Sequence, residues 1–244
     1  MTHKGFEQEI GRAVVVGGGS GMGLAIADAL LAAGAEVTIV GRSSERLADA
    51  VRELGDGKLN AIAADIGDEE QVRRVFDTVG TVDHVLTTAG DTTGTYGPIK
   101  DFDFPNGRGF IETKLIGSML LAKHANITPG GSLTFTSGIA AYRPAVGGAM
   151  VATVNAALEG LARALAVELG PTRVNVVSPG WVRTGIWDRM TWDDKDERLR
   201  AMAERLPVGH LGLPEDIAQA ALSLLRNPFV TGTVLHVDGG HRLV

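Results

Sequence analysis

Short runs of apolar, often β-branched residues alternate along the chain with longer segments in which apolar residues recur every three or four positions. Most of the short runs lack polar alternation, so they predict strands that are covered on both faces. Seven strands are predicted, at residues 12–17, 36–41, 59–65, 82–88, 131–137, 172–178 and 232–238. The intervening segments have helical spacing, for example at residues 23–34, 70–80 and 157–170. This alternation predicts an α/β fold with a doubly wound, seven-stranded parallel sheet flanked by helices.

Size and composition favour a single domain spanning residues 1–244. The chain has 244 residues, of which 44% are hydrophobic, enough to bury one large core. Its net charge of −6 comes with no run of Lys or Arg, so we expect no nucleic-acid partner and no membrane partner. The absence of cysteine excludes disulfides and thiolate metal sites, and we expect no metal. No apolar leader precedes the first strand and no apolar run approaches about eighteen residues, so we expect a cytoplasmic protein.

The first predicted strand ends in a glycine-rich turn, "GGGSGMG" at residues 17–23. Glycines at this turn would let the backbone approach a pyrophosphate closely, and the helix that follows would offer free N–H groups and the positive end of its dipole. Cofactor contacts are therefore predicted along the turn, at Gly17, Gly19, Ser20, Gly21, Met22 and Gly23. The alternative is an ordinary glycine-rich turn between a strand and a helix.

The end of the second predicted strand indicates which dinucleotide binds. An Asp or Glu would hold the ribose hydroxyls of NAD, but this strand ends in Gly41, Arg42 and Ser43. Arg42 can pair with a 2′-phosphate, and Ser43 can donate a hydrogen bond to it. We therefore expect NADP rather than NAD, unless Arg42 is simply a solvated loop charge.

From Arg12 to about Gly240 the sequence resembles the short-chain dehydrogenase/reductase family. The resemblance is carried by the glycine turn, by "ADI" at residues 64–66, by "TTAG" at 87–90, where the family has Asn-Asn-Ala-Gly, and by "RVNVVSPGWVRT" at 173–184. It implies a single Rossmann domain in which a segment at about 181–210 covers the substrate. It also implies an NADP(H)-dependent oxidoreductase that interconverts a carbonyl and an alcohol.

The same resemblance implies the remaining cofactor contacts and the assembly. Contacts to the adenine and to the nicotinamide half are expected from Asp65, Ile66, Ala89, Gly90, Lys114, Pro179, Gly180, Val182 and Thr184. Members of the family usually assemble through two long central helices, which correspond here to residues of about 108–125 and 150–169. We therefore expect a homo-tetramer or a homo-dimer.

The family's catalytic Tyr and Lys are absent from this chain. Ser137 matches the family serine that polarises the substrate, although a plain turn residue is the alternative. Counting forward from Ser137 places the Tyr and Lys positions at Met150 and Val154. Counting back from the matching helix places them at Val151 and Asn155. We favour the second register, because a helix cannot slip by one residue without turning its buried face away.

Lys114 stands where the family has an Asn, just as Asn155 stands where it has the Lys. In the family these two positions face each other beneath the nicotinamide ribose, so the exchange would return an ammonium to nearly the same place. Desolvation and the oxidised nicotinamide would lower the pKa of Lys114 toward neutrality, the range that a general acid needs. Alternatively, Lys114 points along the helix surface in a decayed site. Tyr142, on the loop after Ser137, is a second candidate acid, with a core or lid role as its simpler reading.

The substrate is the least determined part of the prediction. Trp181, Trp187 and Trp192 all fall in the segment that covers the substrate, which favours an apolar or aromatic small-molecule carbonyl or alcohol. These tryptophans could equally pack in a subunit interface. A catalytically silent NADP-binding sensor or scaffold of the same fold is the alternative function.

Overall fold

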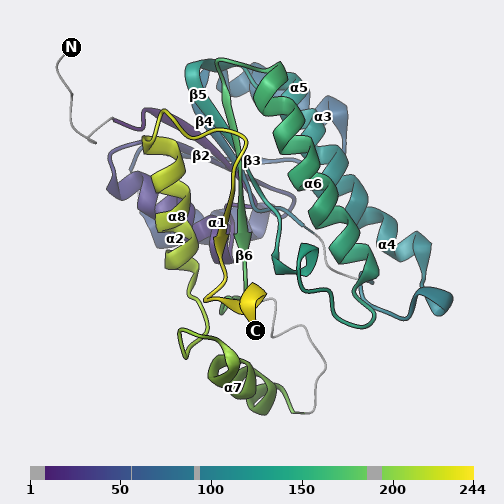
Figure 1. Cartoon of the computed structure of the whole chain (residues 1–244). Coiled ribbons are helices and arrows are strands. Elements are labelled where there is room, and N and C mark those ends of the chain that lie inside the picture. The colour runs from purple at the N-terminus through teal and green to yellow at the C-terminus, as the bar shows by residue number, and fades with distance from the viewer. Residues whose placement is uncertain (1–8, 56, 91–93, 186–193) are drawn as a thin grey trace.

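Seven parallel strands form one continuous sheet in the order β3-β2-β1-β4-β5-β6-β7 (Figure 1). The computed structural model describes residues 9–55, 57–90, 94–185 and 194–244. The strands are β1 (Arg12–Val16), β2 (Glu36–Gly41), β3 (Leu59–Ala63), β4 (Val82–Thr87), β5 (Ile127–Thr136), β6 (Arg173–Pro179) and β7 (Val234–Val237). The predicted fold class is confirmed, because every neighbouring pair in this order runs parallel.

Helices cover both faces of the sheet (Figure 1). On one face lie α1 (Gly21–Ala32), α2 (Ser44–Leu54) and α8 (Pro214–Arg226), and their apolar side chains share one buried cluster with the strands. On the other lie α3 (Glu69–Val79), α5 (Gly117–His124) and α6 (Ala149–Glu168), which pack over a second cluster. The other helical elements of the described residues are α4 (Phe104–Phe110), α7 (Lys195–Arg205), the π-helix η2 (Ile111–Ile116) and the 3-10 turns η1 (Ile99–Asp101), η3 (Ile139–Ala141) and η5 (His241–Leu243).

Two strands differ from the sequence prediction. β5 begins at Ile127 rather than at residue 131, because the chain from Ile127 already pairs with Val82 across an irregularity in the ladder. β3 is exposed at Asn60, Ala61 and Ala63, unlike the fully covered central strands. It is an edge strand, so only part of its surface is covered by helices.

Helix α6 is long and apolar enough, by length and composition alone, to cross a membrane. No apolar run of this length was predicted from the sequence, and that prediction was wrong. In the fold, α6 packs against β6 and η3 and carries a buried carboxylate, Glu159. A long core helix of a globular protein has the same composition, so this feature alone is not evidence that the protein associates with a membrane.

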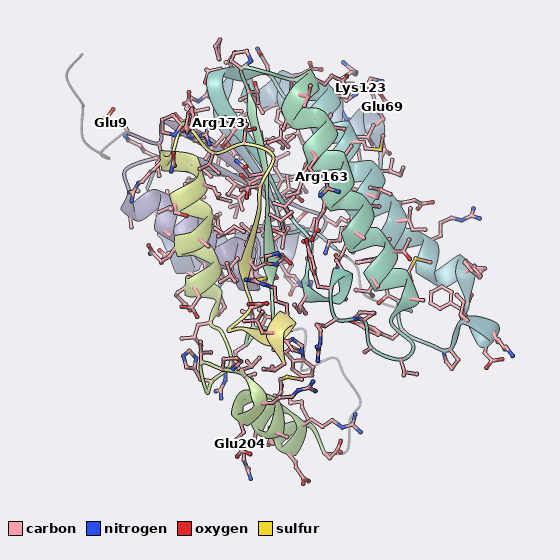
Figure 2. The ribbon with its side chains drawn as sticks, in the orientation of Figure 1. Glu9, Glu69, Lys123, Arg163, Arg173 and Glu204 are labelled. Atoms are coloured by element: carbon pink, nitrogen blue, oxygen red, sulfur yellow. The ribbon has the colours of Figure 1, made fainter. Side chains whose placement is uncertain are left out.

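A buried arginine ties α8 to the sheet. Arg173, at the start of β6, donates hydrogen bonds from Nη1 to the carbonyl of Leu224 at 2.7 Å and from Nη2 to that of Leu225 at 2.8 Å (Figure 2). These carbonyls belong to the last turn of α8, which has no helical partners for them. The guanidinium therefore stabilises the helix end, and these hydrogen bonds compensate the burial of its two terminal nitrogens, whereas Nε has no partner among the described residues.

Candidate active site

A large cavity of about 1270 Å³ lies beyond the carboxyl ends of the central strands. The strand order reverses between β1 and β4, and ligands of doubly wound sheets bind at such a switch point. Residues that line the cavity come from the glycine turn, from the end of β4, from η2, from the end of β5, from α6 and from the end of β6. The topology therefore brings most of the motifs found in the sequence to one cleft.

The glycine turn has the geometry that a dinucleotide requires. Gly17 and Gly21 have φ angles of +84° and +54°, in the region that favours glycine. A Cβ on Gly23 would lie 2.2 Å from the carbonyl oxygen of Gly17, so only glycine lets α1 approach the turn this closely. Ser20 precedes α1 without capping it through its side chain, which leaves the N–H groups of the first turn available to an anion. The turn therefore fits a pyrophosphate.

The predicted phosphate partners lie where β2 ends and α2 begins. Arg42 is exposed at this junction. The Ser43 Oγ accepts a hydrogen bond from the backbone N–H of Arg46 at 3.2 Å and thereby caps α2. A hydroxyl that accepts in this way keeps its own proton for donation.

The predicted adenine contacts are partly used by the fold itself. One carboxylate oxygen of Asp65 accepts a hydrogen bond from the N–H of Gly67 at 2.9 Å. The Ile66 side chain is buried and meets the helix at Gly117, where a Cβ would lie 2.9 Å from Ile66 Cδ1. An adenine would therefore be contacted by the second oxygen of Asp65 and by backbone. Thr88, which replaces a family Asn, sits under the glycine turn, because a Cβ on Gly17 would lie 2.6 Å from its hydroxyl.

Among the other predicted cofactor contacts, the cavity is lined by Met22, Gly90, Lys114, Pro179, Gly180, Val182 and Thr184. Thr184 faces the glycine turn, since a Cβ on Gly21 would lie 3.6 Å from it. Ala89 donates its backbone N–H to the hydroxyl of Thr87 at 3.3 Å and does not line the cavity in the described chain.

Lys114 extends into this cleft from the π-helix η2. Its Nζ donates a hydrogen bond to the backbone carbonyl of Ser137 at 2.9 Å and lies 5.4 Å from the centre of the Phe110 ring. Burial of the ammonium lowers the pKa of Lys114 from 10.5 to about 8. Only one of the three N–H bonds is used by Ser137, so two remain for a ligand. The ammonium therefore lies in the cleft and not on the outer helix surface.

The hydroxyl of Ser137 is held by a carboxylate that the sequence analysis did not single out. Ser137 Oγ donates to Glu159 Oε1 at 2.9 Å, and the Tyr142 hydroxyl donates to Glu159 Oε2 at 2.5 Å. Burial, the hydrogen bond to Glu159 and the charge of Glu159 raise the pKa of Tyr142 to about 12. The ring of Tyr142 also stands edge-on to that of His236, with centroids 4.6 Å apart. Tyr142 is thus bound to Glu159 and is a poor proton donor near neutral pH.

Helix α6 turns Val151 and Asn155 toward the cavity. Val151 and Val154 both pack with Phe110 in a small apolar cluster that Met150 borders, but neither Met150 nor Val154 lines the cavity. This arrangement supports the register in which Val151 and Asn155 occupy the family's Tyr and Lys positions. Asn155 Oδ1 is buried and has no hydrogen-bond partner among the described residues. A buried acceptor is costly without a donor, so a ribose hydroxyl would fit here.

Residues that sequence reasoning missed are chiefly charged ones. Glu159 lies inside a helical pattern of apolar residues, and only its burial reveals its role. Arg143 and Arg205 line the cavity, but the local sequence around each is typical of a solvent-exposed loop or helix surface. Of the three tryptophans, Trp181 lines the cavity, whereas Trp187 and Trp192 lie outside the described residues.

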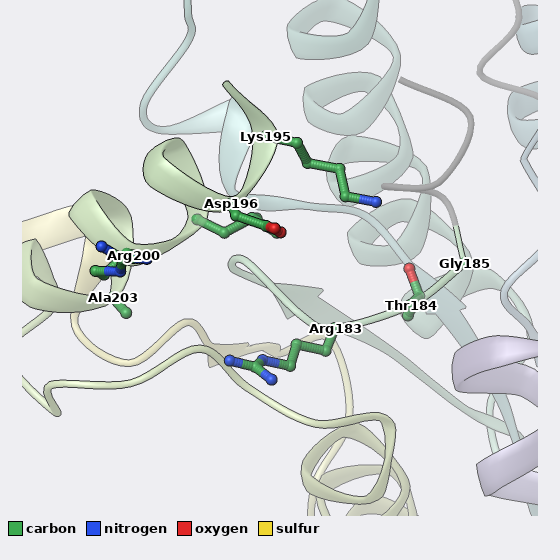
Figure 3. A pocket seen from close by; sticks show the side chains of 8 residues that line it. Arg183, Thr184, Gly185, Lys195, Asp196, Arg200 and Ala203 are labelled. Atoms are coloured by element: carbon green, nitrogen blue, oxygen red, sulfur yellow. The ribbon is translucent and has the colours of Figure 1, made fainter. Parts of the chain in front are cut away.

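A second, smaller cavity of about 550 Å³ lies between α7 and the segment after β6 (Figure 3). Figure 3 shows Lys195 and Asp196 on the α7 side and Arg183 and Thr184 on the other. Neither the glycine turn nor Lys114 borders it, so we place the candidate site in the larger cavity. No group of three or more residues able to hold a metal occurs in the described parts of the chain.

Comparison with known proteins agrees with this geometry. The family model described as enoyl-(acyl carrier protein) reductase matches residues 16–242. The short-chain dehydrogenase/reductase ucsE of Acremonium sp is 34% identical over 251 residues, which cover 93% of each chain. The 3-oxoacyl-[acyl-carrier-protein] reductase of Homo sapiens is 33% identical over 241 residues, covering 94% of this chain and 97% of that one.

A solved small-chain dehydrogenase in complex with NADPH superposes with a TM-score of 0.79 at 32% identity, covering 97% of this chain and 100% of the other. The fold, the glycine turn at the switch point and these matches along nearly the whole chain agree with one another. The chain belongs to the short-chain dehydrogenase/reductase family of NAD(P)-dependent oxidoreductases.

Proposed function

We propose that this protein is an NADP(H)-dependent oxidoreductase that interconverts a carbonyl and an alcohol on a small molecule, with Lys114 as the group that moves the proton. The observation that carries the proposal is the Lys114 ammonium, which is held in the cleft at 2.9 Å from the Ser137 carbonyl while burial lowers its pKa to about 8. Such a pKa leaves the ammonium protonated at neutral pH and still able to release its proton.

We assign a different role to each residue of the cleft. A nicotinamide bound in the cleft would supply the hydride in reduction and accept it in oxidation. Lys114 donates a proton to the carbonyl oxygen in reduction and takes it back in oxidation. Ser137 and Tyr142 donate to Glu159, so their protons are already engaged. Asn155 offers its unpaired Oδ1 to a ribose hydroxyl, and Trp181 gives the cavity an aromatic wall that suits an apolar or aromatic substrate.

Replacing Lys114 tests this proposal. Lys114→Met keeps most of the volume but removes the proton, and Lys114→Arg keeps the charge on a group that does not release its proton. Both variants should bind NADPH within about 1–2 kcal/mol of the parent, while kcat/KM for an accepted carbonyl should fall by a factor on the order of 10² or more. Titration calorimetry and steady-state kinetics across a carbonyl panel supply the two readouts.

The matched control is Lys58→Met, because Lys58 is exposed just before β3 and does not line the cavity. If Lys114→Met turns over as fast as the parent, the assignment of the proton to Lys114 is wrong. If NADPH binds firmly and no carbonyl or alcohol reacts in the parent, the protein is better described as a silent NADP-binding sensor or scaffold.

A further inference from the structure

Among the residues that the structure describes, the side chains that line the large cavity carry charge of only one sign. Its ionisable lining residues are Lys114, Arg143, Arg198, Arg205, His241 and Tyr96, and no Asp or Glu lines it in the described chain. The whole protein has a net charge of −6. A basic cavity in an acidic protein therefore reflects local selection of charge and not overall composition.

Two of these cations, Arg143 and Arg205, lack partners. Arg198 pairs with Asp194 at 2.6 Å. By contrast, neither the Arg143 nor the Arg205 side chain has a hydrogen bond or ion pair with any residue in the described ranges. Asp238, just before η5, accepts hydrogen bonds from the backbone N–H groups of Gly240 and Arg242 and forms an ion pair with the Arg242 guanidinium at 3.7 Å.

These two arginines reach the same end of the cavity from different elements. Arg205 is the last residue of α7, which is joined to the C-terminal turn by a backbone hydrogen bond from Val208 to Gly239. Arg143 follows Tyr142, whose ring rests against His236 of β7. Leu206 and Pro207, which follow Arg205, lie against the same C-terminal turn, because Cβ atoms on Gly239 and Gly240 would be 3.5 Å and 2.7 Å from them. Both arginines therefore line the cavity in the region of His241 of η5, which lines it too. Their positive charges, after burial as the larger cause, lower the pKa of His241.

The cofactor's own phosphates do not account for this pair. The pyrophosphate site lies at the glycine turn after β1 and the expected 2′-phosphate site lies at Arg42 after β2. Arg143 lies in the segment after β5, and Arg205 ends α7, between β6 and α8, so neither belongs to the turns after β1 and β2. Both line the same cavity as Lys114, and this leaves them available to the substrate.

We infer that Arg143 and Arg205 form a subsite for an oxyanion on the substrate, so that the protein acts on an acidic carbonyl compound or its alcohol. This inference rests on the proposed function and specifies its substrate class. Guanidinium groups bind carboxylates and phosphates through short, charge-assisted hydrogen bonds, and two of them converging from separate elements fix both charge and orientation. The aromatic wall at Trp181 then accommodates the apolar body of the same molecule.

The test compares matched probes by calorimetry on the protein loaded with NADP⁺, because the oxidised cofactor has no hydride to transfer to a ketone and no turnover occurs. Benzoylpropionate carries an aromatic ketone and a carboxylate, benzoylpropionamide replaces the charge by a neutral amide, and phenyl phosphate presents the alternative oxyanion. We expect the parent to bind benzoylpropionate about tenfold or more tightly than the amide. Arg143→Gln and Arg205→Gln should each weaken the binding of benzoylpropionate by about tenfold. The affinity for the amide should not change, and the affinity for NADPH should stay within about twofold of the parent's.

Arg74→Gln, on the exposed face of α3, removes the same charge elsewhere and should leave all affinities unchanged. Thermal unfolding of each variant checks that it is folded. If the two substitutions weaken the binding of phenyl phosphate more than that of benzoylpropionate, the result would support the subsite and identify its ligand as a phosphate ester. The inference would be overturned if the parent bound the acid and the amide with equal affinity. It would also be overturned if the two arginine variants lost as much affinity for NADPH as for benzoylpropionate. An inactive protein that still prefers the acid would overturn the proposed function alone.

Discussion

At the scale of single residues, the site is decided by which protons are free to move. The Ser137 and Tyr142 hydroxyls both point at Glu159, and the pKa of Tyr142 is raised to about 12. Lys114 donates to a neutral carbonyl, and burial lowers its pKa to about 8. A donor works best when its pKa is close to the working pH, so Lys114 is better suited than either hydroxyl.

The lowered pKa of Lys114 predicts how stability depends on pH. The folded protein releases this proton near pH 8, whereas the unfolded chain holds it up to about 10.5. Between these values the unfolded state binds more protons, so the free energy of unfolding of the parent should rise with pH relative to Lys114→Met. Below pH 8 the full cost of burying the charge is present. The expected relative gain from pH 7 to pH 10.5 is about 1–3 kcal/mol.

Urea denaturation without cofactor, at several values from pH 7 to pH 10.5, measures this difference. Lys58→Met controls for the loss of a lysine at an exposed position. Curves for the parent and Lys114→Met that stay parallel over the whole range would contradict burial of the ammonium.

The sequence predicted some site residues well and could not predict others. Lys114 and Asn155 both line one cavity, as the exchange of the two family positions led us to expect. The hydrogen bonds of Ser137 could not be foreseen, because Glu159 is one turn along α6 from Asn155 and looks like any polar residue of an amphipathic helix. The unpaired state of Arg143 and Arg205 depends on where α7 and η5 meet, a long-range contact that no local pattern encodes.

At the scale of elements, the strands follow from their apolar runs, but the helix that carries Lys114 does not follow from periodicity. The segment predicted as one helix over about 108–125 consists of α4, the π-helix η2 and α5. The six residues of η2 are too few for the wider spacing of a π-helix to stand out from that of the flanking α-helices. π-turns often occur at functional sites, and this one contains Lys114.

The junction of β2 and α2 determines the expected choice of cofactor. The first turn of α2 lies beside the glycine turn, since a Cβ on Gly19 would be 3.6 Å from Arg46, and Arg42 stands just before this helix. We expect NADPH to bind more tightly than NADH by about 1.5–3 kcal/mol, because a guanidinium can pair with the 2′-phosphate. Arg42→Ala should remove most of that preference in parallel titrations. Arg52→Ala, at the far end of α2, is the control, and equal affinities in the parent would contradict the assignment.

At the scale of the whole molecule, the charge distribution separates the cavity from the surface. The chain is acidic overall with a net charge of −6, while the cavity lining is basic. Such an arrangement directs an anion to the cavity and disfavours its binding elsewhere on the surface. Cofactor and acidic substrate would both be attracted by the same field, and the attraction should weaken as ionic strength rises.

The exposed apolar residues on the helical faces lead to the prediction of assembly. Ile116 and Met119 are 40% and 47% exposed on η2 and α5, and Val167 is 86% exposed near the end of α6. These residues lie on the two helical segments, about 108–125 and 150–169, through which we expect a two-fold interface. A tetramer needs a second interface, and Phe229, which is 98% exposed just before the edge strand β7, provides an apolar surface for it.

Light scattering at micromolar concentration should therefore give a homo-oligomer, a tetramer if both surfaces are used. Met119→Glu places a charge in the expected helix interface and should shift the mass toward smaller species, because a buried unpaired carboxylate costs several kcal/mol. Phe229→Glu should convert a tetramer into a dimer without affecting the helix interface. Ala48→Glu adds the same charge on the exposed face of α2 and should leave the mass unchanged. A monomeric parent, or a loss of assembly in Ala48→Glu equal to that in Met119→Glu, would contradict an interface built from α5 and α6.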